Sequence, residues 1–412
     1  MRGAGSYVPT SDCYTYNAPR PTYGLTSEPV VVQERKARLT YLYASVFLSS
    51  LGLGLVSYFI PRYVQSIGGT FVDLGVVGAS RSFLYAFLPF IMGYLSDRGI
   101  RREMYLLSIA VNLLSTLLLV YAETVLYVVL LQLLASLGIS LLWPITEAMV
   151  AESVDRNERI SAMGWYSVSW ATGFLLGPTL GGWVIGAGGY DALFITSSAV
   201  FLFTLAFTLA TLGRSYRPCA ATLRHGFSLP SRLLSYVYAA VVAYGVIFSI
   251  VVSLFPGYLG AFEYDSMTIG LLFSLFGLFR IFAFLTVDRL NRRLGRWAST
   301  ISVLLMFLGT GIVGAFSVSS LPMVVLVLAL LGYGFGSFFP VTIVYISNRA
   351  TEAGLGAAVG AYEAFFGIGF VIGPIMGGYL SGLTIAAPYL LCSIISLSMP
   401  LLMALQHRKL GA

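Results

Sequence analysis

Residues 173–182 read GFLLGPTLGG and residues 369–378 read GFVIGPIMGG, so the chain carries one pattern twice. The two copies are 196 residues apart. The same offset relates three further pairs of residues: Pro144 and Pro340, Thr146 and Thr342, and Tyr166 and Tyr362. A repeat of about half the chain length in an apolar sequence indicates two fused membrane-spanning halves.

Each copy combines closely spaced glycines with one proline. Glycines at every fourth position let helix backbones approach closely, which matters in a membrane because lipid offers no hydrophobic drive for helices to associate. Proline removes one backbone hydrogen bond and bends a helix at a fixed place. The residues of this helix-packing motif are Gly173, Gly177, Pro178, Gly181 and Gly182 in the first copy and Gly369, Gly373, Pro374, Gly377 and Gly378 in the second. We therefore predict two kinked, tightly packed helices in equivalent positions of two bundles.

The composition excludes a soluble globular protein. Of the 412 residues, 58% are hydrophobic and 10% are charged, whereas soluble proteins contain about 25% charged residues. A membrane-crossing helix needs about 20 apolar residues. Twelve runs meet this requirement, near 40–61, 74–96, 103–122, 125–149, 160–186, 192–213, 233–256, 267–287, 297–317, 321–346, 356–380 and 384–405. We predict an all-α membrane protein with twelve transmembrane helices in two pseudo-symmetric six-helix bundles.

The predicted bundles cover residues 39–213 and 233–406, with a cytoplasmic linker over 214–232. Residues 1–38 are rich in Tyr, Pro, Thr and Ser and lack an apolar core, so we expect a disordered cytoplasmic tail and not a signal peptide. Residues 407–412 form a cytoplasmic C-terminus.

The net charge of +7 reflects topology. All but three of the 24 Lys and Arg residues lie in the tails or in the even-numbered loops; the exceptions are Arg62, Arg81 and Arg280. The positive-inside rule therefore places both termini and the even-numbered loops in the cytoplasm. We predict a multi-pass protein of the plasma membrane, whose partner is the lipid bilayer and not nucleic acid, and we expect it to be a monomer.

The sequence offers no signal for an enzyme, a metal site or a bound cofactor. It has no phosphate-binding P-loop, no Cys/His metal spacing and no Ser-His-Asp arrangement. The two histidines, His225 and His407, fall in predicted cytoplasmic connectors. The three cysteines, Cys13, Cys219 and Cys392, are too far apart to suggest a disulfide framework.

The second predicted span runs into the loop GYLSDRGIRR at 93–102. This loop resembles the signature G-x-L-x-D-R-x-G-R-R between helices 2 and 3 of the major facilitator superfamily, with its second glycine one place early, at Gly99. The matching residues are Gly93, Leu95, Asp97, Arg98, Arg101 and Arg102. The resemblance implies a secondary transporter that works by alternating access, in which this loop latches the halves together in the outward-facing state. A degenerate copy, DRLNRR, stands at 288–293, and positive-inside topology alone is the alternative explanation for both loops.

The pattern G-x-x-x-G-P-x-x-G-G in the fifth span is similar to that of drug and small-molecule exporters in the same superfamily. A second exporter pattern fails, because the position four residues before Gly138 is Leu134 where those exporters carry an arginine linked to proton coupling. The resemblance thus favours export of a small organic solute and leaves the coupling open. The alternatives are metabolite uptake by symport or uniport, and a membrane sensor or scaffold that does not transport.

Four ionisable residues fall inside predicted spans: Arg81, Glu147, Arg280 and Glu363. Charges at membrane depth are costly, so they should face protein or water. Glu363 is the leading candidate for a proton carrier, because desolvation favours the protonated carboxyl group. The alternative is a structural ion pair of Glu363 with Arg280 or Arg81. Glu147 is either a second coupling group or a partner of Arg159 or Arg102.

A substrate cavity should be mostly apolar with a few polar groups. We expect it near the membrane midplane between the first, fourth, seventh and tenth spans. The candidate lining residues are Trp143, Tyr244, Phe248, Tyr333 and Phe338.

Overall fold

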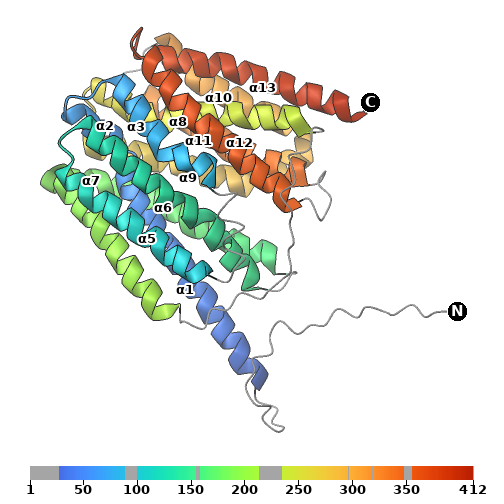
Figure 1. Ribbon diagram of the computed structural model, residues 1–412. Coiled ribbons are helices and arrows are strands. Elements are labelled where there is room, and N and C mark those ends of the chain that lie inside the picture. The colour runs from blue at the N-terminus through green and yellow to red at the C-terminus, as the bar shows by residue number, and fades with distance from the viewer. Residues whose placement is uncertain are drawn as a thin grey trace.

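The computed structural model describes residues 27–88, 100–154, 158–212, 234–295, 297–316, 320–347 and 355–411. In these ranges every regular element is a helix (Figure 1). The first half comprises α1 (Ser27–Ser57), α2 (Ile60–Ser66), α3 (Phe71–Phe83), η1 (Leu84–Ala86), α5 (Arg101–Leu118), η2 (Leu119–Tyr121), α6 (Val125–Glu152) and α7 (Arg159–Thr211). The second half comprises α8 (Ser235–Ala261), α9 (Ser266–Leu294), α10 (Trp297–Phe316), α11 (Leu321–Ser347), α12 (Leu355–Leu380) and α13 (Ala387–Gly411).

Ten helices in the described ranges are long and apolar enough to cross a membrane. One of them, α7, contains two spans, because Gly189 (φ 75°, ψ −167°) interrupts its helical geometry. The left-handed φ is one that glycine adopts without a steric penalty. The second predicted span, 74–96, is described as far as residue 88 and begins as α3 and η1. The twelve-helix fold predicted from the sequence is confirmed.

The first helix begins earlier than predicted. Because α1 starts at Ser27, the predicted disordered tail of residues 1–38 is wrong for residues 27–38, while residues 1–26 lie outside the described part. The stretch QERKAR at 33–38 is made of good helix formers, so the helix continues out of the apolar span into this basic segment.

Side-chain caps fix where two helices start. Thr70 and Asp73 form a capping box at α3, in which Asp73 Oδ2 accepts from the Thr70 backbone N at 2.7 Å. At α9, Asp265 Oδ1 accepts from the backbone N of Thr268 at 2.9 Å. The hydrogen bonds from Thr268 to this carboxylate hold the pKa of Asp265 below its usual value.

The sequence repeat returns as a repeated contact. In the first half, the hydroxyls of Thr146 on α6 and Tyr166 on α7 lie 3.0 Å apart. In the second half, Thr342 on α11 and Tyr362 on α12 lie 3.3 Å apart. These are two of the residue pairs related by the offset of 196, so the halves share their internal packing as well as their sequence.

Each half is organised around two long packed helices. In the first half α1 packs along α7, and in the second half α8 packs along α12. The halves meet where α7 contacts α9 and where α3 contacts α12, and we call these two contacts the α7–α9 seam and the α3–α12 seam. Both described chain ends lie at one end of the molecule, on the right in Figure 1. We call this the basic end, because the predicted cytoplasmic loops lie there.

Candidate functional site

Both seams are closed by bare backbone contacts at the end opposite the basic end. On the α3–α12 seam, Gly75 lies against the backbone of Pro374 and Gly378. On the α7–α9 seam, Gly270 lies against the backbone of Pro178 and Thr179. In both cases a glycine of one half rests on the motif proline of the other half. The two motif copies therefore interlock the halves in a pseudo-symmetric way.

The motif glycines divide between two faces of their helices. On α7, Gly173 and Gly177 lie against α1, with the position of an added Cβ at Gly177 only 2.7 Å from Gly54 Cα, whereas Gly182 lies against Met267 of α9. Of the remaining motif residues, Gly181 lies against α1, Gly369, Gly373 and Gly377 against α8, and Gly378 against α3. The motif thus packs each half internally on one face and joins the halves on the other.

The α3–α12 seam stays closed toward the centre of the molecule. There Gly367 of α12 lies against Ala86 of η1, with an added Cβ 2.8 Å from Ala86 Cα. Beside this contact the Tyr85 hydroxyl donates a hydrogen bond of 3.0 Å to Glu363 Oε2. Glu363 on α12 is therefore bound to the first half, at a place where the halves must separate if they move.

Unlike the α3–α12 seam, the α7–α9 seam is closed at only one end. On this seam the hydroxyls of Thr179 and Ser274 form a hydrogen bond of 2.7 Å. Toward the basic end the helices diverge and leave a cleft of about 620 Å³ between α7, α9 and α11, lined by uncharged residues only. Trp165 is 61% exposed and Leu285 is 72% exposed on its walls. We call this cavity the lateral cleft.

Two carboxylates, one from each half, approach each other in the interior. Glu147 of α6 is exposed, and it interacts electrostatically with Glu363 and with the Tyr85 hydroxyl. Within the described ranges neither carboxylate forms an ion pair with an arginine or lysine. Two acidic groups without a cationic counterpart are suited to bind protons or a cationic group.

The ion pair of Glu363 with Arg280 or Arg81, the alternative to a proton carrier, is not formed among the described residues. Arg81 donates instead to Gln132 Oε1 at 3.1 Å and to Ser57 Oγ at 2.8 Å, both within the first half. The Arg280 guanidinium lies over three aromatic rings: its Cζ is 5.0 Å from the ring centre of Phe248 and 5.9 Å from those of Phe276 and Trp170. Among the described residues, the buried Arg280 Nε has no hydrogen-bond partner.

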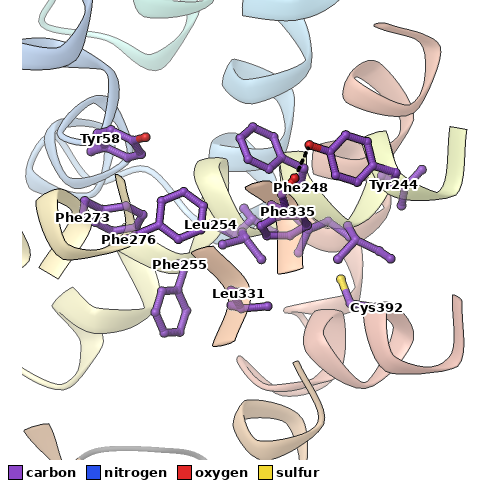
Figure 2. Packing of buried hydrophobic residues seen from close by; sticks show 14 of the residues in the cluster. Tyr58, Tyr244, Phe248, Leu254, Phe255, Phe273, Phe276, Leu331, Phe335 and Cys392 are labelled. Carbon is purple, nitrogen blue, oxygen red and sulfur yellow. Dashed lines mark hydrogen bonds between the residues drawn. The ribbon is translucent and has the colours of Figure 1, made fainter. Parts of the chain in front are cut away.

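The aromatic candidates have different surroundings. Tyr244 and Phe338 are 2% and 0% exposed and belong to the core of the second half, where Tyr244 donates to the Phe335 carbonyl (Figure 2). Phe248 contacts the same cluster and also carries Arg280. Trp143 packs against Trp170 of α7, with ring centres 6.2 Å apart.

Two further aromatic residues, Tyr333 and Tyr58, make contacts between helices. Tyr333 is held at the α9–α11 contact by Thr286, 2.9 Å away. Tyr58, in the turn after α1, reaches across to the second half and stacks on Phe273, with ring centres 4.4 Å apart; Figure 2 shows both residues in the buried cluster. Of the predicted lining residues, Trp143 contacts Trp170 and Phe248 contacts Arg280. Arg280 in turn lies over Trp170 across the α7–α9 seam.

Most of the signature loop lies outside the described residues, including Gly93, Leu95, Asp97 and Arg98. The two described arginines bind within the first half. Arg101 is buried and forms an ion pair with Glu152 at the end of α6, and Arg102 Nε donates to the Leu212 carbonyl after α7 at 2.6 Å. The expected Arg102–Glu147 contact is therefore not formed. In the second copy of the loop, Asp288 pairs locally with Arg292.

Sequence reasoning missed several residues of the site. Tyr85 gives no signal because its role depends on a partner 278 positions away. Gly75 and Gly270 stand outside the motif, although an offset of nearly 196 residues between them could have identified them as equivalent.

The similarities to known proteins agree with this architecture. The sequence profile of the family described as Major Facilitator Superfamily matches residues 42–313 and 237–409. Multidrug resistance protein 2 of Bacillus subtilis is 23% identical over 382 residues, covering 88% of this chain and 94% of its own length. Quinolone resistance protein NorA of Staphylococcus aureus is 24% identical over 390 residues, covering 89% and 96%. Multidrug resistance protein MdtG of Klebsiella pneumoniae is 26% identical over 362 residues, covering 84% and 87%.

Solved structures show the same fold. The nucleoside transporter NupG superposes with a TM-score of 0.72 at 15% identity, covering 91% of this chain and 99% of its own. A bacterial homologue of the human lysosomal transporter Spinster, in an inward-facing and occupied conformation, superposes with a TM-score of 0.74 at 13% identity, covering 93% and 98%.

Proposed function

The chain belongs to the major facilitator superfamily, and from this premise we propose that it exports small lipophilic organic compounds in exchange for protons. Secondary transport by alternating access is the activity of this family and its relatives. The proposal adds the direction, the substrate class and the coupling ion. The relatives named for drug resistance support export, and the uncharged lining of the lateral cleft supports a lipophilic compound.

One observation carries the proton coupling. Glu363 has no cation beside it in the described structure, and its hydrogen-bond donor, Tyr85, belongs to the other half. A structural ion pair would hold the carboxylate charged permanently, whereas a tyrosine hydroxyl can bind a protonated or an ionised carboxyl group. The protonation state of Glu363 therefore acts directly on a contact between the halves. Glu147, which faces Glu363 from the first half, is the second candidate carrier.

The mechanism follows from the seams. The halves rock about the central site, and the glycine contacts at Gly75 and Gly270 close the end opposite the basic end. Alternating access requires these contacts to open while the basic end closes. The hydrogen bond between Tyr85 and Glu363 lies between those two ends, so protonation there can bias the balance between the two states.

The test is proton flux in liposomes that contain the purified full-length protein. A panel of lipophilic cations, neutral aromatic compounds and organic acids is added, and internal pH is followed with a trapped dye. Wild type is compared with Glu363→Gln and Glu147→Gln. Glu103→Gln is the matched control, because Glu103 is an exposed glutamate on α5. We expect substrate-evoked proton movement in wild type and in the control, and its loss in Glu363→Gln.

Direction is tested separately in cells. Cells that express wild type should retain less of a lipophilic dye than cells that express Glu363→Gln. Higher retention with wild type would support uptake in place of export. The absence of proton movement with every compound would refute proton coupling and leave both glutamates as structural residues.

A further inference from the structure

The lateral cleft is shaped to hold an apolar group. Its lining combines large apolar surfaces with small hydroxyl-bearing residues and includes no acidic or basic side chain. Gly164 forms part of the α7 wall, and a side chain added there would meet no atom within 4 Å. The cleft thus offers room beyond what its own side chains fill, and its volume is that of a typical small-molecule site.

A charge lies behind the inner wall of this cleft. Trp170 lines the cleft and contacts Phe284 of α9, with ring centres 6.2 Å apart. The Arg280 guanidinium lies over the same Trp170 ring, 5.9 Å from its centre. One tryptophan therefore separates an apolar cavity from a cation.

Within the described ranges Arg280, a partly buried residue, forms no ion pair. Burying an arginine at this depth costs several kcal/mol unless it is paired or hydrated. Its interactions in the described structure are with aromatic rings, and each such contact contributes only about 0.5–2 kcal/mol. By comparison, Arg81 has two hydrogen-bond acceptors. Arg280 retains a buried Nε donor with no acceptor.

We propose that the lateral cleft and Arg280 together bind an amphiphilic organic anion. The apolar body of the ligand occupies the cleft, and its carboxylate or sulfonate reaches Arg280 past the edge of Trp170. A planar guanidinium binds such groups through charge-assisted hydrogen bonds. Only the Nε of Arg280 is buried without a partner in the described structure, so the terminal nitrogens are the donors that a ligand would meet. The inference rests on the proposed transport function and specifies the polar group of its substrate.

The experiment measures binding by the full-length protein in nanodiscs of zwitterionic phosphatidylcholine. The probes are 11-(dansylamino)undecanoic acid and its methyl ester, which differ in a single charge. Empty nanodiscs correct for partition into lipid. We expect wild type to prefer the acid by about tenfold or more, the usual effect of a charge-assisted hydrogen bond.

Two pairs of variants separate the parts of the site. Arg280→Gln should bind acid and ester equally, and Arg280→Lys should recover part of the preference. Arg289→Gln is the matched control, because Arg289 lies exposed on the same helix. Gly164→Leu should weaken both probes by the same factor by filling the cleft. Gly186→Leu should not, since Gly186 is an equally open position on α7 that does not line the cleft.

Competition identifies the source of the anion. Displacement of the probe by oleate but not by 2-naphthoate supports a lipid-derived acid, and the reverse supports a compact aromatic acid. Equal binding of acid and ester by wild type, an acid preference that survives in Arg280→Gln, or no displacement by either competitor would overturn the proposal. These outcomes are independent of proton flux, so the inference and the proposed function can fail separately.

Discussion

Replacing Gly75 by leucine on the α3–α12 seam should also open the other contact between the halves, the α7–α9 seam. Gly75 belongs to α3, and a side chain at this position would collide with the carbonyl group of Pro374. The position of its Cβ lies 3.2 Å from Pro374 C and 3.1 Å from Gly378 Cα. All of these atoms are backbone, so no rotamer change relieves the overlap. The halves must separate at this place, or the variant must occupy the state in which they are already apart.

The size of the effect follows from the packing. Overfilling a close-packed contact costs roughly 1–3 kcal/mol. Because the collision exists only while the seam is closed, this energy acts on the equilibrium between closed and open states. A bias of that size changes the equilibrium constant by about 5- to 150-fold. Either half alone keeps its internal packing, since the described contacts of Gly75 lie in the other half.

Disulfide formation across the α7–α9 seam measures the closed state. The hydroxyls of Thr179 and Ser274 lie 2.7 Å apart, so Thr179→Cys and Ser274→Cys place two thiols face to face. The native cysteines Cys13, Cys219 and Cys392 are first replaced. Under a mild oxidant, the cross-linking rate reports how often this seam closes. We expect Gly75→Leu to slow cross-linking, because rigid halves must open both seams together.

The reasoning fails if Gly75→Leu cross-links as fast as its parent while remaining folded. Such a result would mean that the two seams open independently or that α3 bends away locally. Gly270→Leu serves as the local comparison, because it lies on the seam that carries the cysteines. Thermal denaturation of each variant shows whether the slower rate reflects a changed equilibrium or a damaged fold.

Three further predictions concern contacts made within one half. Gly177→Leu should abolish transport while leaving membrane insertion intact, because its side chain would overlap the backbone of Gly54 within one half; transport at the wild-type rate would contradict the packing argument. Arg101→Gln should lower the denaturation midpoint because it removes the ion pair between the buried Arg101 and Glu152, and the double variant with Glu152→Gln should recover part of the loss. Asp265→Ala should cost about 1 kcal/mol at neutral pH. Hydrogen bonds lower the pKa of Asp265 in the folded state. The stabilisation by its carboxylate is therefore complete above the pKa of the unfolded state and is lost as pH falls through the lowered pKa of the folded state. The difference in stability between wild type and variant should vanish in acid.

The sequence was sufficient for the architecture because lipid imposes simple requirements. Runs of about 20 apolar residues are needed to cross the hydrocarbon core, and every backbone group must bond within its own helix. The repeat at 173–182 and 369–378 then predicts two halves, and the paired Thr–Tyr contacts follow it residue for residue. The start of α1 was predicted wrongly because the polar composition of residues 27–38 indicates exposure to water, and an exposed segment can still be helical.

The partners of the intramembrane charges could not be predicted in the same way. Counting residues from a loop gives the depth of Glu363, at about 1.5 Å per residue. Depth does not give the direction in which a side chain points, and that direction depends on how each helix is rotated against its neighbours. An arginine was the expected partner because it neutralises charge, but a tyrosine hydroxyl occupies the position instead. The lateral cleft likewise arises from the divergence of three helices, which no local pattern encodes.

Both seams are closed by a glycine that lies against a motif proline of the other half. Toward the centre of the molecule they carry different groups. The α3–α12 seam carries Tyr85 and Glu363, whereas the α7–α9 seam opens into the lateral cleft. Protonation of Glu363 would replace a charge-assisted hydrogen bond by a neutral one, which is roughly half as strong. This loosens one seam by about 1 kcal/mol, enough to change the populations of two states that are close in energy. Because the halves move as units, proton binding at the α3–α12 seam would also alter the width of the cleft at the other seam. Under the proposed coupling, the proton would control access to the lateral cleft without touching the compound bound there.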